Sequence, residues 1–207
     1  ELTIKLMKIN SKLVDLEIKK VSSLEEMINC FRLGKNDYDY MVGWINNFVS
    51  VKKLGTGIFQ GAKHCLGNDK FEVISENKNL SFSIPFYFPN FFLNSYVINF
   101  FNKFKLLLQS KDLKKTRTSL FSFLTPLDKI LNWNKLYGHK GLLQYQFILP
   151  DNENVTKNIC KILTEIQKNK TNSYLIVIKL HRRSKGFLSF PIDGFSLACD
   201  FPNTEDV

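Results

Sequence analysis

The stretch Leu142-Leu-Gln-Tyr-Gln-Phe-Ile-Leu149 decides the fold class of this sequence. Its apolar side chains alternate with Gln144 and Gln146, and this period of two predicts a β-strand with one apolar face. Pro150 ends the strand. A helix is predicted next, because apolar residues recur at helical spacing at Val155, Ile159, Ile162, Leu163 and Ile166. Another alternating segment, 173–181, predicts a second strand.

The remaining C-terminal residues extend this strand-helix-strand pattern. Asp151 or Asn152 is the expected N-cap of the helix, since both side chains can accept hydrogen bonds from free backbone N–H groups. Two further strands are predicted at 187–190 and 195–201, joined by a hairpin turn at Asp193-Gly194.

A similar order of elements is predicted near the N-terminus. A strand at 13–21 is followed by a helix, whose start is marked by a capping box of Ser23 and Glu26. Strands at 38–45 and 55–64 come next. The order strand-helix-strand-strand therefore occurs twice. We predict one α+β domain over residues 1–207, built from two similar β-α-β-β halves, with a mostly antiparallel sheet and helices packed on one face.

Other segments have weaker signals. Residues 1–10 alternate like a strand, Asn94 can cap a helix that runs to Leu108, and 120–124 predicts a short strand. Residues 111–118 are predicted to be a basic, polar connector. The aromatic-rich stretch 82–92 contains two prolines, so it is either a buried extended crossing or an exposed apolar loop.

Composition excludes several classes of protein. Of the 207 residues, 44% are hydrophobic and 23% charged, which excludes global disorder, and no apolar run is long enough for a membrane span. The formal charge of +10 favours anionic partners, but the basic residues are spread along the chain, so no nucleic-acid partner is expected. The four cysteines are widely spaced, which predicts free thiols and a cytoplasmic location.

The polar faces of three predicted strands suggest a binding surface. Gln144 and Gln146 share one face of the first strand, as Lys179 and His181 do in the second. The face of the last strand carries Ser196, Ala198 and Asp200. If these strands are neighbours, amides, an ammonium, an imidazole and a hydroxyl line one surface that could bind a polyol or a sugar phosphate. The alternative is that this face is simply solvated.

Bond-making chemistry has no support in the residues. The sequence contains no G-x-S-x-G, H-E-x-x-H or P-loop motif, and its three histidines lack metal-ligand spacing. Gly55, Gly57 and Gly61 only weakly echo a dinucleotide-binding motif, which we reject. We therefore assign no catalytic, cofactor-binding or metal-binding residue to this chain.

Several motifs together resemble a known family. They are Val42-Gly-Trp-Ile45, Leu54-Gly-Thr-Gly57, Pro126-Leu-Asp128, Trp133-Asn-Lys-Leu-Tyr-Gly138, the 141–150 strand, Leu188-Ser-Phe-Pro191 and Leu197-Ala-Cys-Asp-Phe-Pro202. In order and spacing they are similar to the substrate (cap) domain of bacterial FAD-linked oxidases of the decaprenylphosphoryl-β-D-ribose 2′-oxidase type, in the vanillyl-alcohol oxidase superfamily. The resemblance implies that an FAD-binding domain lies outside this chain, and a start at Glu1 fits that expectation.

The resemblance also implies roles for individual residues. Gln144, Gln146 and Lys179 match positions that line the pocket facing the flavin, and Trp44 matches an aromatic wall of that pocket. Ser196 and Ala198 match pocket positions on the last strand. Three positions depart from the family: Ala198 replaces a cysteine of the mycobacterial enzymes, His181 replaces an aromatic residue, and Ser196 replaces asparagine.

The function implied is that of the substrate-binding domain of an FAD-dependent oxidoreductase. Such an enzyme oxidises a sugar or polyol hydroxyl by hydride transfer to flavin, as in the cell-wall enzymes that act on polyprenyl-phosphoryl pentose. The expected partners are this sugar substrate and the FAD domain of the same polypeptide, with peripheral membrane association through 82–92 and the positive charge. A noncatalytic module that binds anionic lipid or glycolipid is the alternative.

Overall fold

Residues 3, 5, 8–9, 11–65, 82–89, 95–109, 113–126, 130–169, 173–185 and 191–203 are described by the computed structural model. Seven strands of the large sheet are β1 (Leu13–Val21), β2 (Tyr40–Ile45), β3 (Gly57–His64), β5 (Lys114–Ser119), β7 (Leu142–Pro150), β8 (Leu175–His181) and β9 (Gly194–Pro202). They lie in the order β5-β1-β3-β2-β8-β9-β7, and every neighbouring pair is antiparallel. The predicted α+β class is confirmed.

The two predicted halves are visible in this order. From one side of the sheet toward its middle the strands follow in the order β1, β3, β2, and from the other side they follow in the order β7, β9, β8. The halves meet where β2 pairs with β8, with Trp44 opposite Val177. Helix α1 (Leu24–Gly34) follows β1, and helix α4 (Val155–Lys168) follows β7, so each half has the order β-α-β-β.

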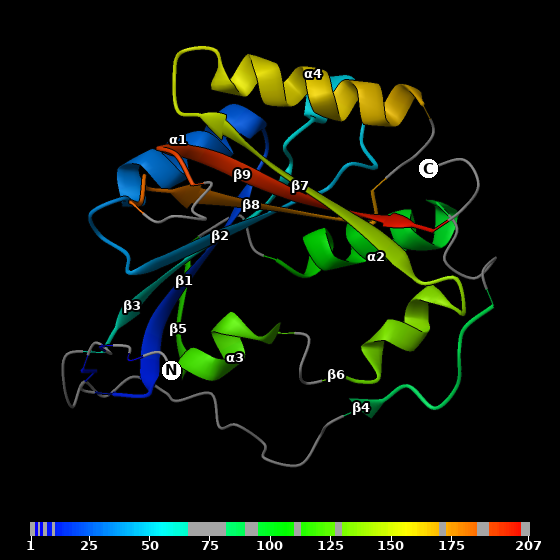
Figure 1. Cartoon of the computed structure of the whole chain (residues 1–207), viewed down its shortest axis with the longest axis horizontal. Coiled ribbons are helices and arrows are strands. Elements are labelled where there is room, and N and C mark those ends of the chain that lie inside the picture. The colour runs from blue at the N-terminus through cyan, green and yellow to red at the C-terminus, as the bar shows by residue number, and fades with distance from the viewer. Residues whose placement is uncertain are drawn as a thin grey trace.

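The main core lies between the sheet and helices α1 and α4, which cover the same face (Figure 1). Phe31 of α1 contacts Phe59 of the first half edge-to-face, with ring centroids 5.1 Å apart, and Phe195 of the second half at 5.8 Å. From α4, Val155, Ile159 and Leu163 belong to the same buried cluster. These are the stripes that helical spacing predicts.

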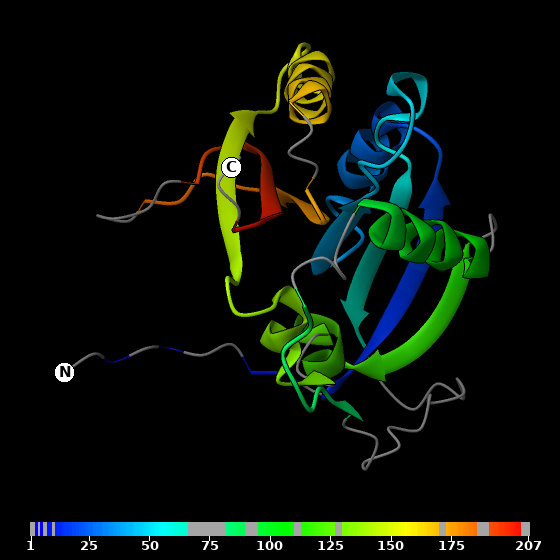
Figure 2. The ribbon, with the colours of Figure 1, turned by 90° about the vertical axis from the view of Figure 1, so that its right-hand side faces the viewer.

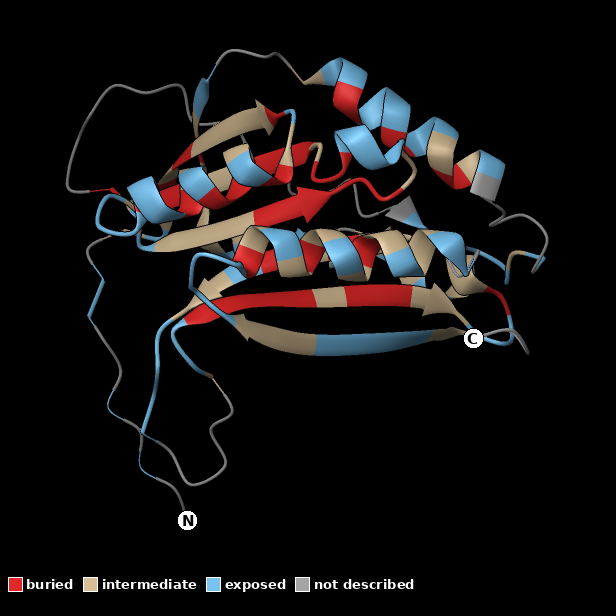
Figure 3. Ribbon diagram, turned by 90° about the horizontal axis from the view of Figure 1, so that it is seen from above, coloured by how far each residue is buried: buried red, intermediate tan, exposed pale blue. Residues whose placement is uncertain are grey.

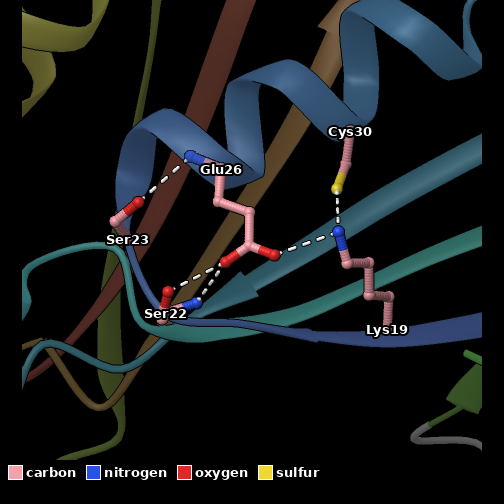
Figure 4. Close-up of polar contacts among 5 residues, drawn as sticks. All are labelled: Lys19, Ser22, Ser23, Glu26 and Cys30. Atoms are coloured by element: carbon pink, nitrogen blue, oxygen red, sulfur yellow. Dashed lines mark hydrogen bonds and ion pairs between the residues drawn. The ribbon is translucent and has the colours of Figure 1, made fainter. Parts of the chain in front are cut away.

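The start of α1 has the predicted capping residues, with one change of partner (Figure 4). The Ser23 hydroxyl accepts a hydrogen bond from the Glu26 backbone N–H at 3.1 Å. The Glu26 carboxylate accepts from the N–H and hydroxyl of Ser22, not from the N–H of Ser23, and pairs with Lys19 at 3.0 Å. The first turn of α1 is therefore tied to the end of β1.

Two further helices lie on the opposite face of the sheet, against the first half. Helix α2 (Ser95–Leu108) contributes Leu106 to a cluster with Trp44 and Ile58. Helix α3 (Leu120–Leu124) packs Leu120 and Phe123 against a cluster that includes Val14 and Leu16. In Figure 2, α2 lies on the side of the first-half strands, away from β7 and β9.

Three expectations about connecting segments are wrong. The 111–118 connector contains strand β5, which pairs with β1 and uses its edge N–H and C=O groups; its Lys, Thr and Arg residues have no apolar alternation. The predicted 120–124 strand is helix α3, which begins where the Ser119 hydroxyl accepts from the Ser122 N–H. The N-cap of α4 is Asn154, not Asp151 or Asn152; the Asp151 carboxylate pairs with Arg32, and Oδ1 of Asn152 accepts from the Asn154 N–H.

Other expectations fall partly or wholly outside the described residues. Within 1–10, the described Thr3, Lys5, Lys8 and Ile9 belong to no strand, so the predicted strand is wrong there. Asn94 and the predicted 187–190 strand lie outside the described residues, whereas Asp193 is described and directly precedes β9, which begins at Gly194. In 82–92, Phe86 and Tyr87 are exposed and Ile84 is buried, so the described part of this stretch favours an exposed loop.

Four small elements remain in the described part of the chain. Strands β4 (Phe82–Ser83) and β6 (Ile130–Leu131), which lie below the sheet in Figure 1, form a two-stranded parallel ladder. The short 3-10 helices η1 (Val51–Lys53) and η3 (Trp133–Tyr137) lie in the connections after β2 and β6.

Candidate functional site

The strand register places the predicted site residues on one face of the sheet. Gln146 and Val177 both lie opposite Ala198, while Lys179 lies opposite Ser196. Directly opposed residues of antiparallel strands point to the same side, so these side chains share a face. Trp44 joins them through its pairing with Val177. This surface, defined by Trp44, Gln144, Gln146, Lys179, His181, Ser196 and Ala198, is called the candidate surface below.

The candidate surface lies on the face opposite α1 and α4. Ile176, Ile178 and Leu197 alternate with its residues and are fully buried under those helices. Gln144, Gln146 and Lys179 are exposed. Gln146 on β7 and Lys179 on β8 lie on either side of β9. Because neighbouring strands are about 4.8 Å apart, the two strands are separated by roughly 10 Å. That span suits a ligand the size of a monosaccharide.

A hydrogen-bonded pair marks one end of the candidate surface. The Ser196 hydroxyl is 2.7 Å from Nε2 of His181. Ser196 is buried, and His181 is half-buried. Burial and, to a smaller extent, the charge of Lys179 lower the pKa of His181, so its imidazole is neutral at pH 7. The pair thus offers neutral donor and acceptor groups beside one ammonium.

Asp200 marks the other end of the candidate surface. Its carboxylate accepts a hydrogen bond from Nε2 of Gln144 at 2.7 Å, and the residue is only 5% exposed. Burial raises the pKa of Asp200, and the Gln144 hydrogen bond opposes that shift. The bond fixes the amide of Gln144 so that its Oε1 remains an acceptor. Asp200 also contributes to raising the pKa of Tyr137, after burial, to about 12.

Trp44 lies on the same face but is largely covered by α2. Its indole is 8% exposed and packs with Ile58 and Leu106. The Lys105 ammonium lies 4.2 Å from the centre of the indole ring, a cation–π contact. Although Lys105 is exposed as a residue, burial of its ammonium beside the indole lowers its pKa. The structure therefore places Trp44 at the border of the candidate surface, where α2 covers the sheet.

Sequence patterns missed one residue that the structure adds, Lys105. Alternation had already placed Asp200 on this face, and the structure gives it Gln144 as a partner. Lys105 had no such signal, because its position over Trp44 depends on the packing of α2 on the sheet. Cavities of about 420 and 560 Å³ lie elsewhere, lined by Glu17 and Lys115 and by Lys35 and Arg182 respectively.

The three glycines that echo a dinucleotide motif have structural roles. A Cβ on Gly57 would lie 1.9 Å from the Trp44 carbonyl oxygen, and one on Gly61 would lie 2.7 Å from the Tyr38 ring. Gly55 has φ +86° and touches the backbone of Leu24. Strand pairing and helix contact explain these glycines without a bound phosphate. Among the described residues, no three His, Cys, Asp or Glu side chains form a metal-binding group.

Comparison with known proteins identifies a distant relative. The chain is 30% identical over 192 residues to the decaprenylphosphoryl-beta-D-ribose oxidase of Mycolicibacterium smegmatis. The match covers 87% of this chain but 40% of that oxidase, so the chain spans well under half the length of its relative. No model of a protein family matches the chain. The chain is thus distantly related to an oxidase.

Proposed function

We propose that this chain is the substrate-binding domain of an FAD-dependent oxidoreductase that oxidises a sugar or polyol hydroxyl, such as that of a polyprenyl-phosphoryl pentose. The observation that carries the proposal is the common face of Gln144, Gln146 and Lys179. The relationship to an oxidase of a decaprenylphosphoryl ribose supports it, because that substrate combines hydroxyls with an anionic phosphate.

The residues of this chain would bind and orient the substrate. Gln146 and the free oxygen of Gln144 can hold ring hydroxyls, while Lys179 supplies positive charge for an anionic or carbonyl oxygen. The neutral His181 and Ser196 can accept or donate one further hydrogen bond. A flavin, when bound, would accept the hydride from the carbinol carbon, and the protein contributes orientation and electrostatics.

The flavin would be held by a domain outside this chain. Gly55, Gly57 and Gly61, which echo a dinucleotide motif, are explained by packing, and the candidate surface carries groups suited to a substrate. The 207-residue chain alone is therefore predicted to bind no FAD and to be colourless. Stoichiometric FAD binding by this chain would contradict the division into a substrate domain and a flavin domain.

The site assignment is tested by substitution in the flavoprotein that contains this segment. Gln146→Ala and Lys179→Ala are each expected to lower kcat/KM by about tenfold or more with flavin content retained, since each removes a hydrogen bond to substrate. The matched control is Tyr145→Ala, an exposed neighbour on the opposite face. Wild-type turnover in the first two variants would exclude the candidate surface as the substrate site.

A noncatalytic module for anionic lipid or glycolipid is the second candidate, favoured by the exposed apolar side chains of α2. The two functions differ in turnover. An assembly that contains a noncatalytic binding module would show no flavin-dependent oxidation of a sugar or polyol.

A further inference from the structure

Helix α2 has an apolar outward side. Six of its large apolar side chains are at least half exposed: Tyr96, Phe100, Phe101, Phe104, Leu107 and Leu108. Phe100 and Phe104 stack one turn apart, with centroids 6.4 Å apart and planes 10° from parallel. In Figure 3 the exposed residues alternate with buried ones along this helix.

The inward side of α2 is held to the sheet partly by polar contacts. The Asn102 amide is 8% exposed and donates to Oδ1 of Asn46 at 3.1 Å. The Leu106 carbonyl accepts from the Lys20 ammonium at 2.7 Å. A surface helix ordinarily turns its apolar stripe toward the protein. Here only Ile98 and Leu106 are buried apolar residues, and the aromatic side chains point away.

Positive charge accompanies this apolar side. Residues 95–118 contain six Lys or Arg residues and one Asp, so this short stretch holds half of the chain's net charge of +10. Lys115 and Arg117 pair with Glu17 and Asp15. Lys103 and Lys105 lie on α2 itself, one on each margin of the apolar side by helical spacing.

We propose that the outward side of α2 docks the protein on an anionic lipid surface, with the helix lying in the plane of the interface. Aromatic and Leu side chains would enter the boundary between headgroups and acyl chains, and Lys103 would contact anionic headgroups, while the Lys105 ammonium stays over the Trp44 ring. The helix has 14 residues and is about 21 Å long, shorter than the roughly 30 Å hydrocarbon core. None of the described helices is long and apolar enough to cross a membrane.

The same charges disfavour a second copy of the chain as the occupant. In a two-fold dimer through α2, the Lys103 ammonium of each copy would lie at the margin of the same interface, and like charges across an interface are repulsive. An anionic bilayer complements them instead. This inference stands on α2 alone and does not require the proposed oxidase function.

The test is sedimentation of the 207-residue chain with lipid vesicles. One set contains phosphatidylcholine only, and the other contains phosphatidylcholine and phosphatidylglycerol. We expect binding to the anionic vesicles that weakens with added salt, and little binding to the neutral ones. The double variant Phe100→Ser/Phe104→Ser should bind at least tenfold more weakly. The matched control is Phe121→Ser, an exposed phenylalanine on α3, which should bind like the wild type.

Each alternative outcome overturns the proposal. Equal binding of wild type and double variant, with circular dichroism showing both folded, would remove α2 from the interface. A concentration-dependent dimer that the double variant abolishes, without vesicle binding, would assign the face to a second copy. In the assembled flavoprotein, α2 could be protected from hydrogen exchange although the protein binds no vesicles. That result would show that another domain covers the outward side of α2. Turnover on a water-soluble sugar reports the proposed function separately.

Discussion

The strands β1, β3 and β2 of the first half correspond in order to β7, β9 and β8 of the second, yet the halves use one face of the sheet differently. In the first half this face carries Val14, Leu16 and Ala62, which are buried beneath α3. In the second half the same face carries the amides, ammonium and hydroxyl of the candidate surface. The repeated fold is used for packing in one half and, as we propose, for binding in the other.

The carboxylates of the two halves show the same contrast. Asp15 of β1 accepts two hydrogen bonds from the buried Arg117 guanidinium, at 2.7 and 3.2 Å, and these lower its pKa. Asp200 of β9 has only an uncharged amide partner, and burial raises its pKa. The Arg117 partner favours the ionised form of Asp15, whereas burial beside an uncharged amide disfavours ionisation of Asp200.

The largest expected effect is on the stability of the hydrophobic core that the two halves share. Phe31→Ala should lower the free energy of unfolding by about 3–5 kcal/mol, because Phe31 contacts both Phe59 and Phe195 in the common core. The measurement is urea unfolding followed by circular dichroism. Leu33→Ala on the exposed side of the same helix is the control and should change stability by about 0.5 kcal/mol or less. Two separate unfolding transitions would show that the halves do not share one core.

A smaller effect is expected at the ion pair of the first half. Arg117→Ala should cost about 1.5–3 kcal/mol at pH 7, since it removes hydrogen bonds to a charged partner. The lowered pKa of Asp15 means that its contribution is fully present above about pH 4 and is lost as the pH falls through the folded-state pKa. Unfolding curves at several pH values should therefore converge for wild type and variant in acid. A constant difference between them would contradict this role of Asp15.

The smallest effect is expected at Asp200 and has the opposite sign. A carboxyl with a raised folded-state pKa loses stability as the pH rises from about 4 through that pKa. Asp200→Asn keeps an acceptor for Gln144 and removes the ionisation, so it should stabilise the fold at pH 7 by about 0.5 kcal/mol or more. The gain should vanish in acid. A clear loss of stability at pH 7 would show that the Asp200 charge has a stabilising partner.

Local patterns predicted the repeated part of the fold because its faces differ in polarity. Strands near 13–21 and 142–149, the capping residues of α1 and the stripes of α1 and α4 were all predictable, since alternation and helical spacing report which side of an element is buried. The side-chain alternation also predicted that Gln144, Lys179 and Ser196 share a face once their strands are neighbours. Their role in binding a substrate stays a prediction.

Alternation and helical spacing were enough to predict the two halves, the buried stripe of α4 and the polar rows of the last three strands. The folded chain was needed to show that residues 114–119 form an edge strand, that Leu120 begins a helix, and that Lys105 lies over Trp44. These features depend on strand partners and helix docking, which are set by contacts between residues far apart in the chain. The outward aromatic side of α2 shows this limit most clearly: apolar residues at helical spacing are typical of a buried stripe, yet the sheet holds the side with Asn102.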